Sequence, residues 1–165
     1  MNPFVILIEI AVLLLGFGGL VFGMLLINPL TFISDYPPEI QAAYYRTQQK
    51  EATRISLTVL MIVKKTVAAV AFLFLFAWLS HLAGATTFWQ GAALTAVYIL
   101  CVFAFDTFFL DWVLFANIKR VRLPGTEHME QAYRQKWFHV KVCLPVAPFA
   151  VIACLLSGGL MLLVW

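Results

Sequence analysis

Four long apolar runs constrain this chain more than any other feature of its sequence. They cover about residues 4–27, 55–82, 87–117 and 140–165, and each reaches the roughly 20 residues that a helix needs to cross a lipid bilayer. Within lipid, backbone groups find partners only inside a helix or a closed barrel. The runs therefore predict an all-α integral membrane protein, with a bundle of four transmembrane helices in a single membrane domain.

The composition agrees with lipid as the main solvent. The 165 residues are 63% hydrophobic and only 12% charged, whereas a soluble domain carries about 25% charged residues. Too few polar side chains remain to cover a water-exposed surface. This excludes an ordinary soluble enzyme or nucleic-acid-binding domain, and we expect the lipid bilayer, not nucleic acid, to be the main partner.

Two polar connections, residues 28–54 and 118–139, carry most of the basic side chains. The N-terminal residues, the short turn near Gly84 and the C-terminal residues contain no lysine or arginine. By the positive-inside rule, both connections face the cytoplasm and both termini face outward. We therefore expect a multi-pass protein of the cell membrane.

Each connection is expected to contain an amphipathic cytoplasmic helix. Pro37 and Pro38 suit a helix start with Glu39 in its first turn, and Thr126 suits the cap of a helix that begins at Glu127. The spacing from Glu39 to Tyr45-Arg46 recurs from Glu127 to Tyr133-Arg134. An internal repeat would explain this, but shared helix-capping residues explain it more simply.

Charged residues also occur inside the apolar runs. Lys65 precedes Gly84 by 19 residues and Asp106 follows it by 22, so an antiparallel hairpin places them at similar depth. At 1.5 Å per residue this depth is about 30 Å from the outer surface, near the inner interface. We expect Lys64 or Lys65 to pair with Asp106, either to fix helix register or to form a polar ligand site.

The stretch FDTFFLDW adds a second carboxylate, Asp111, five residues after Asp106. On an α-helix this spacing places the two side chains about 140° apart, which excludes a shared catalytic dyad unless the helix is broken there. The hypothesis is a charged vestibule at the inner surface, lined by Lys64, Lys65, Asp106 and Asp111. Glu127, His128 and His139 would close it from below.

Three functions fit such a vestibule. The favoured one is binding of a lipid-like or ionic ligand, or of a partner protein. The alternative is a membrane-embedded enzyme acting on a lipid or peptide, with Asp111 or Glu127 as general base and His128 or His139 as proton-transfer partner. The third is a transport component. An enzyme requires a carboxylate and a histidine within hydrogen-bond reach of each other at a cavity. A binding function predicts that Asp106 is paired with a lysine. A transport function predicts a polar path that continues past the middle of the membrane.

Other features point to packing. His128 and His139 are eleven residues apart, too far to share a metal ion on one helix, so no metal or cofactor is expected. Cysteines 101, 143 and 154 lie in apolar runs, show no zinc-like spacing and are expected to pack as small residues. A Glu9–His81 contact would neutralise both groups near the outer surface.

Three glycines of the first run, Gly16, Gly19 and Gly23, have the spacing of small residues at helix contacts in membranes. Packing within the chain is the favoured interpretation. Homo-oligomerisation through the same glycines is the alternative.

Three motifs resemble one family. DYPPEIQ (residues 35–41), DTFFLDW (106–112) and LPGTE (123–127) are similar to a group of small, uncharacterised bacterial integral membrane proteins with about four spans. The resemblance implies a bacterial inner-membrane location. It implies no activity and no functional residues.

Overall fold

The computed structural model describes residues 1–48 and 54–165, and within these ranges every regular element is helical. Lys50, a basic residue of the first connection, lies outside them. Four stretches are long and apolar enough to cross a membrane, which confirms the predicted all-α fold with four such helices: Pro3–Ile27, Ile62–Leu82, Phe88–Phe115 and Lys136–Val164. Many apolar side chains along them are exposed, as expected of surfaces that face lipid.

The four candidate spans are built from seven helical elements. The first is α1 (Pro3–Ile27), the second lies within α3 (Arg54–Leu82), and the third joins α4 (Phe88–Phe105) to η2 (Asp106–Phe115). The last consists of α6 (Lys136–Cys143), η4 (Leu144–Val146) and α7 (Ala147–Val164). The α-helical bonding of this last stretch is interrupted at η4, because this 3₁₀ segment contains Pro145, which has no backbone N–H.

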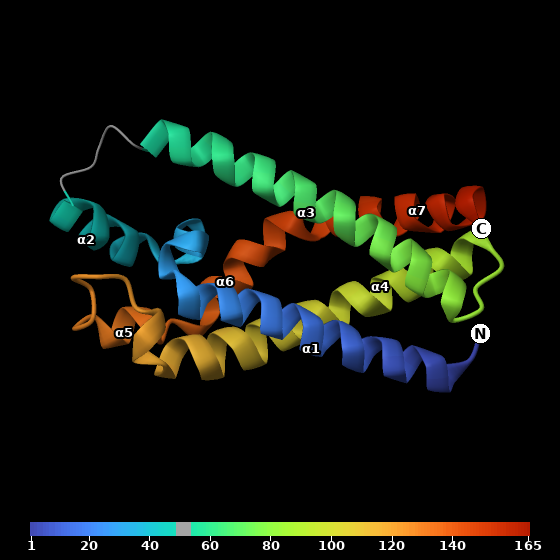
Figure 1. Ribbon diagram of the computed structural model, residues 1–165, viewed down its shortest axis with the longest axis horizontal. Helices are drawn as coiled ribbons and strands as arrows, with labels where there is room; N and C mark the ends of the chain where they lie inside the picture. Colours follow the sequence, from blue (N-terminus) through green and yellow to red (C-terminus); the bar gives the residue numbers. More distant parts are fainter. Residues whose placement is uncertain (49–53) are drawn as a thin grey trace.

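Both chain termini and the α3–α4 turn lie at one end of the bundle, here called the terminal end (Figure 1). The backbone N–H of Asn2 donates to the carbonyl of Ala83 in that turn, at 2.9 Å. At the opposite end, the polar end, lie η1 (Pro29–Asp35) and α2 (Pro38–Gln48), together with η3 (Lys119–Val121) and α5 (Glu130–Tyr133). This is the hairpin arrangement that the distribution of basic residues predicts.

Helices α4 and α7 approach each other closely. Gly91 and Gly158 face each other, and a Cβ atom added at Gly158 would lie 2.6 Å from the carbonyl oxygen of Phe88. Beside them the hydroxyls of Thr95 and Ser157 form a buried hydrogen bond of 2.8 Å. Small residues thus set the separation of these two helices.

The glycines of α1 behave differently. A Cβ added at Gly16, Gly19 or Gly23 would meet nothing within 4 Å, whereas one at Gly18 would lie 2.8 Å from the ring of Phe105. The interpretation that the three spaced glycines pack within the chain is therefore wrong, because the helix turns a different face to its neighbours. A contact with a second copy through them stays a prediction.

A buried aromatic cluster fills the polar end. The Tyr36 hydroxyl donates to the carbonyl of Val121 at 2.6 Å, and its ring contacts Phe115 and Tyr133 at centroid distances of 5.0 and 6.1 Å. These contacts tie η1 to the end of η2 and to the second connection. They hold together the segments that carry the candidate site.

The second connection is less helical than predicted. Its helix α5 spans four residues and begins at Glu130, not at Glu127. Thr126 is fully buried, and its hydroxyl donates to the carbonyl of Leu123 at 2.8 Å. The side chain that was expected to cap a helix is instead part of a turn, which leaves α2 as the one extended helix in the two connections as described.

Candidate functional site

A cavity of about 340 Å³ opens at the polar end. We call it the vestibule. Four elements contribute its charged and ionisable lining. Asp35 comes from η1 and Lys65 from α3, while η2 provides Asp106 and Asp111 and α6 provides His139. Most of the remaining lining is apolar: Phe17, Val21, Leu25, Phe32, Phe115, Phe138, Val142 and Val146.

Both aspartates reach this cavity because η2 is a π-helix. The backbone N–H of Ala116 donates to the carbonyl of Asp111, five residues earlier. A π-helix has more residues per turn than an α-helix, so side chains five apart lie closer together around its axis than the 140° of an α-helix. The 140° separation assumed an unbroken α-helix and does not hold here, and both aspartates line the vestibule. π-Helical turns are rare and occur often at functional sites.

Asp111 is paired with His139. Its Oδ2 lies 3.0 Å from the histidine Nδ1, and the two side chains are only 18% and 13% exposed. The His139 ring also packs edge-on against Phe115, at a centroid distance of 5.7 Å. Because Phe115 is held by Tyr36, the aromatic cluster fixes the orientation of the imidazole.

Lys65 is paired with Asp35, not with Asp106. The Nζ atom of Lys65 lies 2.7 Å from Oδ1 of Asp35, and both side chains are substantially exposed. The expected cross-hairpin pair is wrong, because η1 folds back beside α3 and offers a nearer, better solvated carboxylate. Among the described residues, no hydrogen bond or ion pair involves the Asp106 carboxylate, and Lys64 is exposed outside the vestibule lining.

Glu127 and His128 do not reach the vestibule. His128 lies beside Glu39 in a separate, shallow depression at the surface of the polar end. Glu127 is exposed, and backbone N–H groups of Glu127 and Gly125 hold the pKa of its carboxyl below the usual value. Without the predicted helix from Glu127 to His139, nothing carries these two side chains toward the vestibule.

Two residues that line the vestibule were not predicted as site residues. Asp35 belongs to the DYPPEIQ motif and lies just before the start of α2. Cys143 also lines the vestibule, and it follows His139 by four residues, which places both side chains on one helix face. That spacing is the signal that could have identified it.

In the terminal half, Glu9 has a different partner from the one predicted. The Tyr98 hydroxyl donates to Oε2 of Glu9 at 2.6 Å, while the His81 ring stacks on Trp165 with a centroid distance of 5.6 Å. The predicted Glu9–His81 contact is wrong, because the carboxylate points inward to α4.

In residues 1–48 and 54–165, no three His, Cys, Asp or Glu side chains are arranged so that they could hold a metal ion. In comparisons with known proteins, no family model, curated protein or solved structure matches this chain.

Proposed function

We propose that the protein binds a lipid-like ligand with a cationic head in the vestibule. The observation that carries this proposal is the unequal charge of the lining. Three carboxylates face one lysine and one histidine, and that lysine is already paired with Asp35. A cation is the ligand group that would best offset the excess negative charge.

The shape of the vestibule supports a small amphiphilic molecule over a partner protein. Its volume of about 340 Å³ lies in the range of small-molecule sites, roughly 300–1,000 Å³. Aromatic and aliphatic walls from α1, η1 and α6 suit an apolar body, and the carboxylates suit one polar head. Asp106 and the Asp111–His139 pair are the groups we assign to that head.

The same proposal includes a place in the cell. The polar end holds most of the basic residues, which supports a cytoplasmic orientation of that end and outward-facing termini. The resemblance of the three motifs supports a bacterial cytoplasmic membrane. The ligand would then enter from the inner leaflet or from the cytoplasm.

Native mass spectrometry of the detergent-solubilised protein tests the binding. The probes are dodecyltrimethylammonium and dodecyl sulfate, which share a chain and differ in the sign of the head. We expect wild type to retain the cation selectively and Asp106→Asn to bind it about tenfold more weakly, a loss of about 1.4 kcal/mol.

Glu127→Gln is the matched control, because it removes a carboxylate of the same end that lies outside the vestibule. It should bind the cation like wild type. Equal retention of both probes by wild type, or equal binding by the Asp106→Asn protein, would refute the proposal.

The second candidate function is an enzyme that transfers a proton at the membrane interface. The 3.0 Å contact between Asp111 and His139 favours it, because a carboxylate that holds one imidazole nitrogen leaves the other available for general acid–base chemistry. In this reading His139 exchanges the proton and Asp111 orients it.

The variant His139→Gln distinguishes the two functions. If the protein is an enzyme, wild type should convert components of a bacterial polar lipid extract, followed by mass spectrometry, and His139→Gln should not. A protein that only binds its ligand converts no lipid in either form. An unchanged lipid profile with wild-type protein contradicts the enzymatic alternative and leaves the binding function standing.

A further inference from the structure

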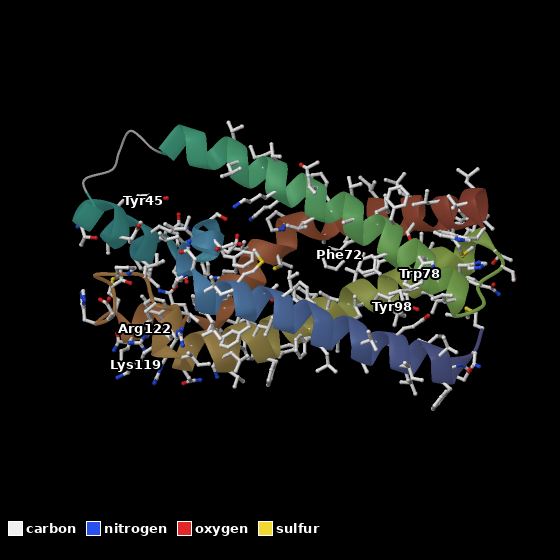
Figure 2. All side chains as sticks on the ribbon, in the orientation of Figure 1. Tyr45, Phe72, Trp78, Tyr98, Lys119 and Arg122 are labelled. Atoms are coloured by element: carbon white, nitrogen blue, oxygen red, sulfur yellow. The ribbon has the colours of Figure 1, made fainter. Side chains whose placement is uncertain are left out.

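A second cavity lies in the half of the bundle nearer the termini, between α1 and α3. It has a volume of about 390 Å³, and we call it the groove. Phe72 and Tyr98, labelled in Figure 2, lie between the ribbons of these two helices in this view. Apolar side chains and Gly16 form almost all of its lining: Ile8, Val12, Leu13, Phe17, Leu20, Phe72, Leu75, Trp78, Leu79 and Leu82. It shares only Phe17 with the vestibule.

Glu9 is the one ionisable residue in this lining. It is only 7% exposed, and its Oε2 accepts the hydrogen bond from Tyr98. The other oxygen, Oε1, is buried and has no hydrogen-bond partner in the part of the chain that the structure describes. A buried polar atom left without a partner costs roughly 1–3 kcal/mol, so such atoms in native proteins usually mark a site that something else completes.

The Glu9 carboxylate is held in place. Tyr98 is fully buried, and its ring stacks on Phe76 at a centroid distance of 6.1 Å and an interplanar angle of 21°. The phenol therefore cannot swing away, and its single proton already goes to Oε2. A partner for Oε1 has to come from a molecule in the groove.

We propose that the groove binds a long-chain lipid alcohol whose hydroxyl donates a hydrogen bond to Oε1 of Glu9. An apolar chain fits the lining, and Oε1 needs one donor. A hydroxyl provides that donor at a much lower desolvation cost than an ammonium group. A fatty acid in its ionised form would bring a second negative charge to the carboxylate. This site is independent of the vestibule and of the function proposed for it.

Photolabelling of the protein in lipid nanodiscs tests the assignment. The probes are a hexadecanol with a mid-chain diazirine, its methyl ether and the corresponding amine, with adducts mapped by peptide mass spectrometry. We expect the alcohol to label groove residues at least fivefold more than the ether, which has the same shape and no donor. The amine should label less than the alcohol.

Two variants address the site and one serves as control. Gly16→Leu should reduce alcohol labelling at least fivefold, because a side chain there enters the groove and meets no protein atom within 4 Å of its Cβ. Gly19→Leu should leave it unchanged, since Gly19 is equally free of neighbours but does not line the groove. Glu9→Gln should abolish the preference for the alcohol over the ether, because Tyr98 can still donate to the amide oxygen while the amide nitrogen becomes a donor, and the oxygen of either probe can accept from it.

Melting temperatures of the three variants show that each still folds. Equal labelling of wild type by alcohol and ether, or an undiminished preference for the alcohol in the Glu9→Gln protein, would mean that bilayer chains fill the groove without recognition by Glu9 and would overturn the proposal. Stronger labelling by the amine than by the alcohol would overturn it as well, since Glu9 would then select a cation. None of these outcomes bears on cation binding in the vestibule.

Discussion

The α4–α7 contact and the aromatic cluster at the polar end are both buried, but opposite kinds of residue build them. Between α4 and α7 the partners are small: Gly91, Gly158 and the hydroxyl pair of Thr95 and Ser157. At the polar end the partners are large rings, with Tyr36, Phe115 and Tyr133 in mutual contact. The first region lies between two candidate spans, the second among the polar connections.

The predicted membrane topology explains this difference, because it places lipid outside the first region and water outside the second. In lipid, apolar side chains gain little by leaving the solvent, so helices associate through close packing and hydrogen bonds between small residues. Near water, the hydrophobic effect rewards the burial of large rings, and tyrosine hydroxyls then need partners. The two regions are expected to respond differently to the same kind of substitution.

The largest effect is expected for Gly158→Ala. The added Cβ would lie 2.6 Å from the Phe88 carbonyl oxygen and 3.0 Å from the Ala92 backbone nitrogen, so backbone must move. We expect the free energy of unfolding to fall by about 3 kcal/mol, measured by titration with sodium dodecyl sulfate in mixed micelles. Gly19→Ala, with no neighbour within 4 Å, should be neutral or stabilising by up to about 1 kcal/mol. Equal effects of the two variants would show that close approach does not hold α4 to α7.

A smaller effect is expected for Tyr133→Phe at the polar end. The Tyr133 hydroxyl accepts from the backbone N–H of Leu123 at 2.9 Å and bonds the Thr126 hydroxyl at 2.6 Å. Leu123 and Thr126 are fully buried, so loss of the hydroxyl leaves polar atoms without partners. The free energy of unfolding should fall by about 2 kcal/mol in the same titration. Thr126→Val should lower the free energy of unfolding less in the Tyr133→Phe protein than in wild type, because the two hydroxyls bond each other. Equal losses in the two proteins would argue against a connected hydrogen-bond network.

The polar end should also be sensitive to alkaline pH. Burial raises the pKa of Tyr36 above its usual value of about 10, and nearby Tyr133 raises it further. A group with a raised folded-state pKa contributes its full stability below about pH 10 and loses it as the pH increases beyond that value. Between pH 9 and pH 11 we expect wild type to lose about 1 kcal/mol more than Tyr36→Phe. Parallel losses by the two proteins would contradict this.

The sequence predicted the helices well because lipid imposes one rule on long apolar runs. The four candidate spans and the hairpin turn near Gly84 follow from the length and spacing of the apolar runs. The glycine spacing in α1 misled, because small-residue spacing does not say which helix face is covered. The two glycines that do lie in close contact, Gly91 and Gly158, belong to different helices. A contact of this kind produces no regular spacing of small residues within either helix.

The candidate site was predicted only in part. The depth of Lys65 and Asp106 along the hairpin predicted correctly that both lie at the same end of the bundle. Depth alone does not show that η1 folds back beside α3, where Asp35 forms the ion pair with Lys65. The π-helix had no visible cause in DTFFLDW, so the separation of the two aspartates was taken from an α-helix. Both errors arise from tertiary contacts and backbone hydrogen bonding, which a pattern of residue types does not contain.

The smallest effect is expected for the hydroxyl pair between α4 and α7. Thr95 and Ser157 are fully buried and bond at 2.8 Å, yet in a membrane the unfolded helices also find partners for their hydroxyls. Such pairs are therefore worth only about 0.6 kcal/mol on average. A double-mutant cycle with Thr95→Val and Ser157→Ala should give a coupling energy near that value, well below the cost of Gly158→Ala. A coupling energy above about 2 kcal/mol would show that hydrogen bonding, and not close backbone approach, holds α4 against α7. The two regions would then differ only in the size of their buried side chains, since hydrogen bonds would stabilise both.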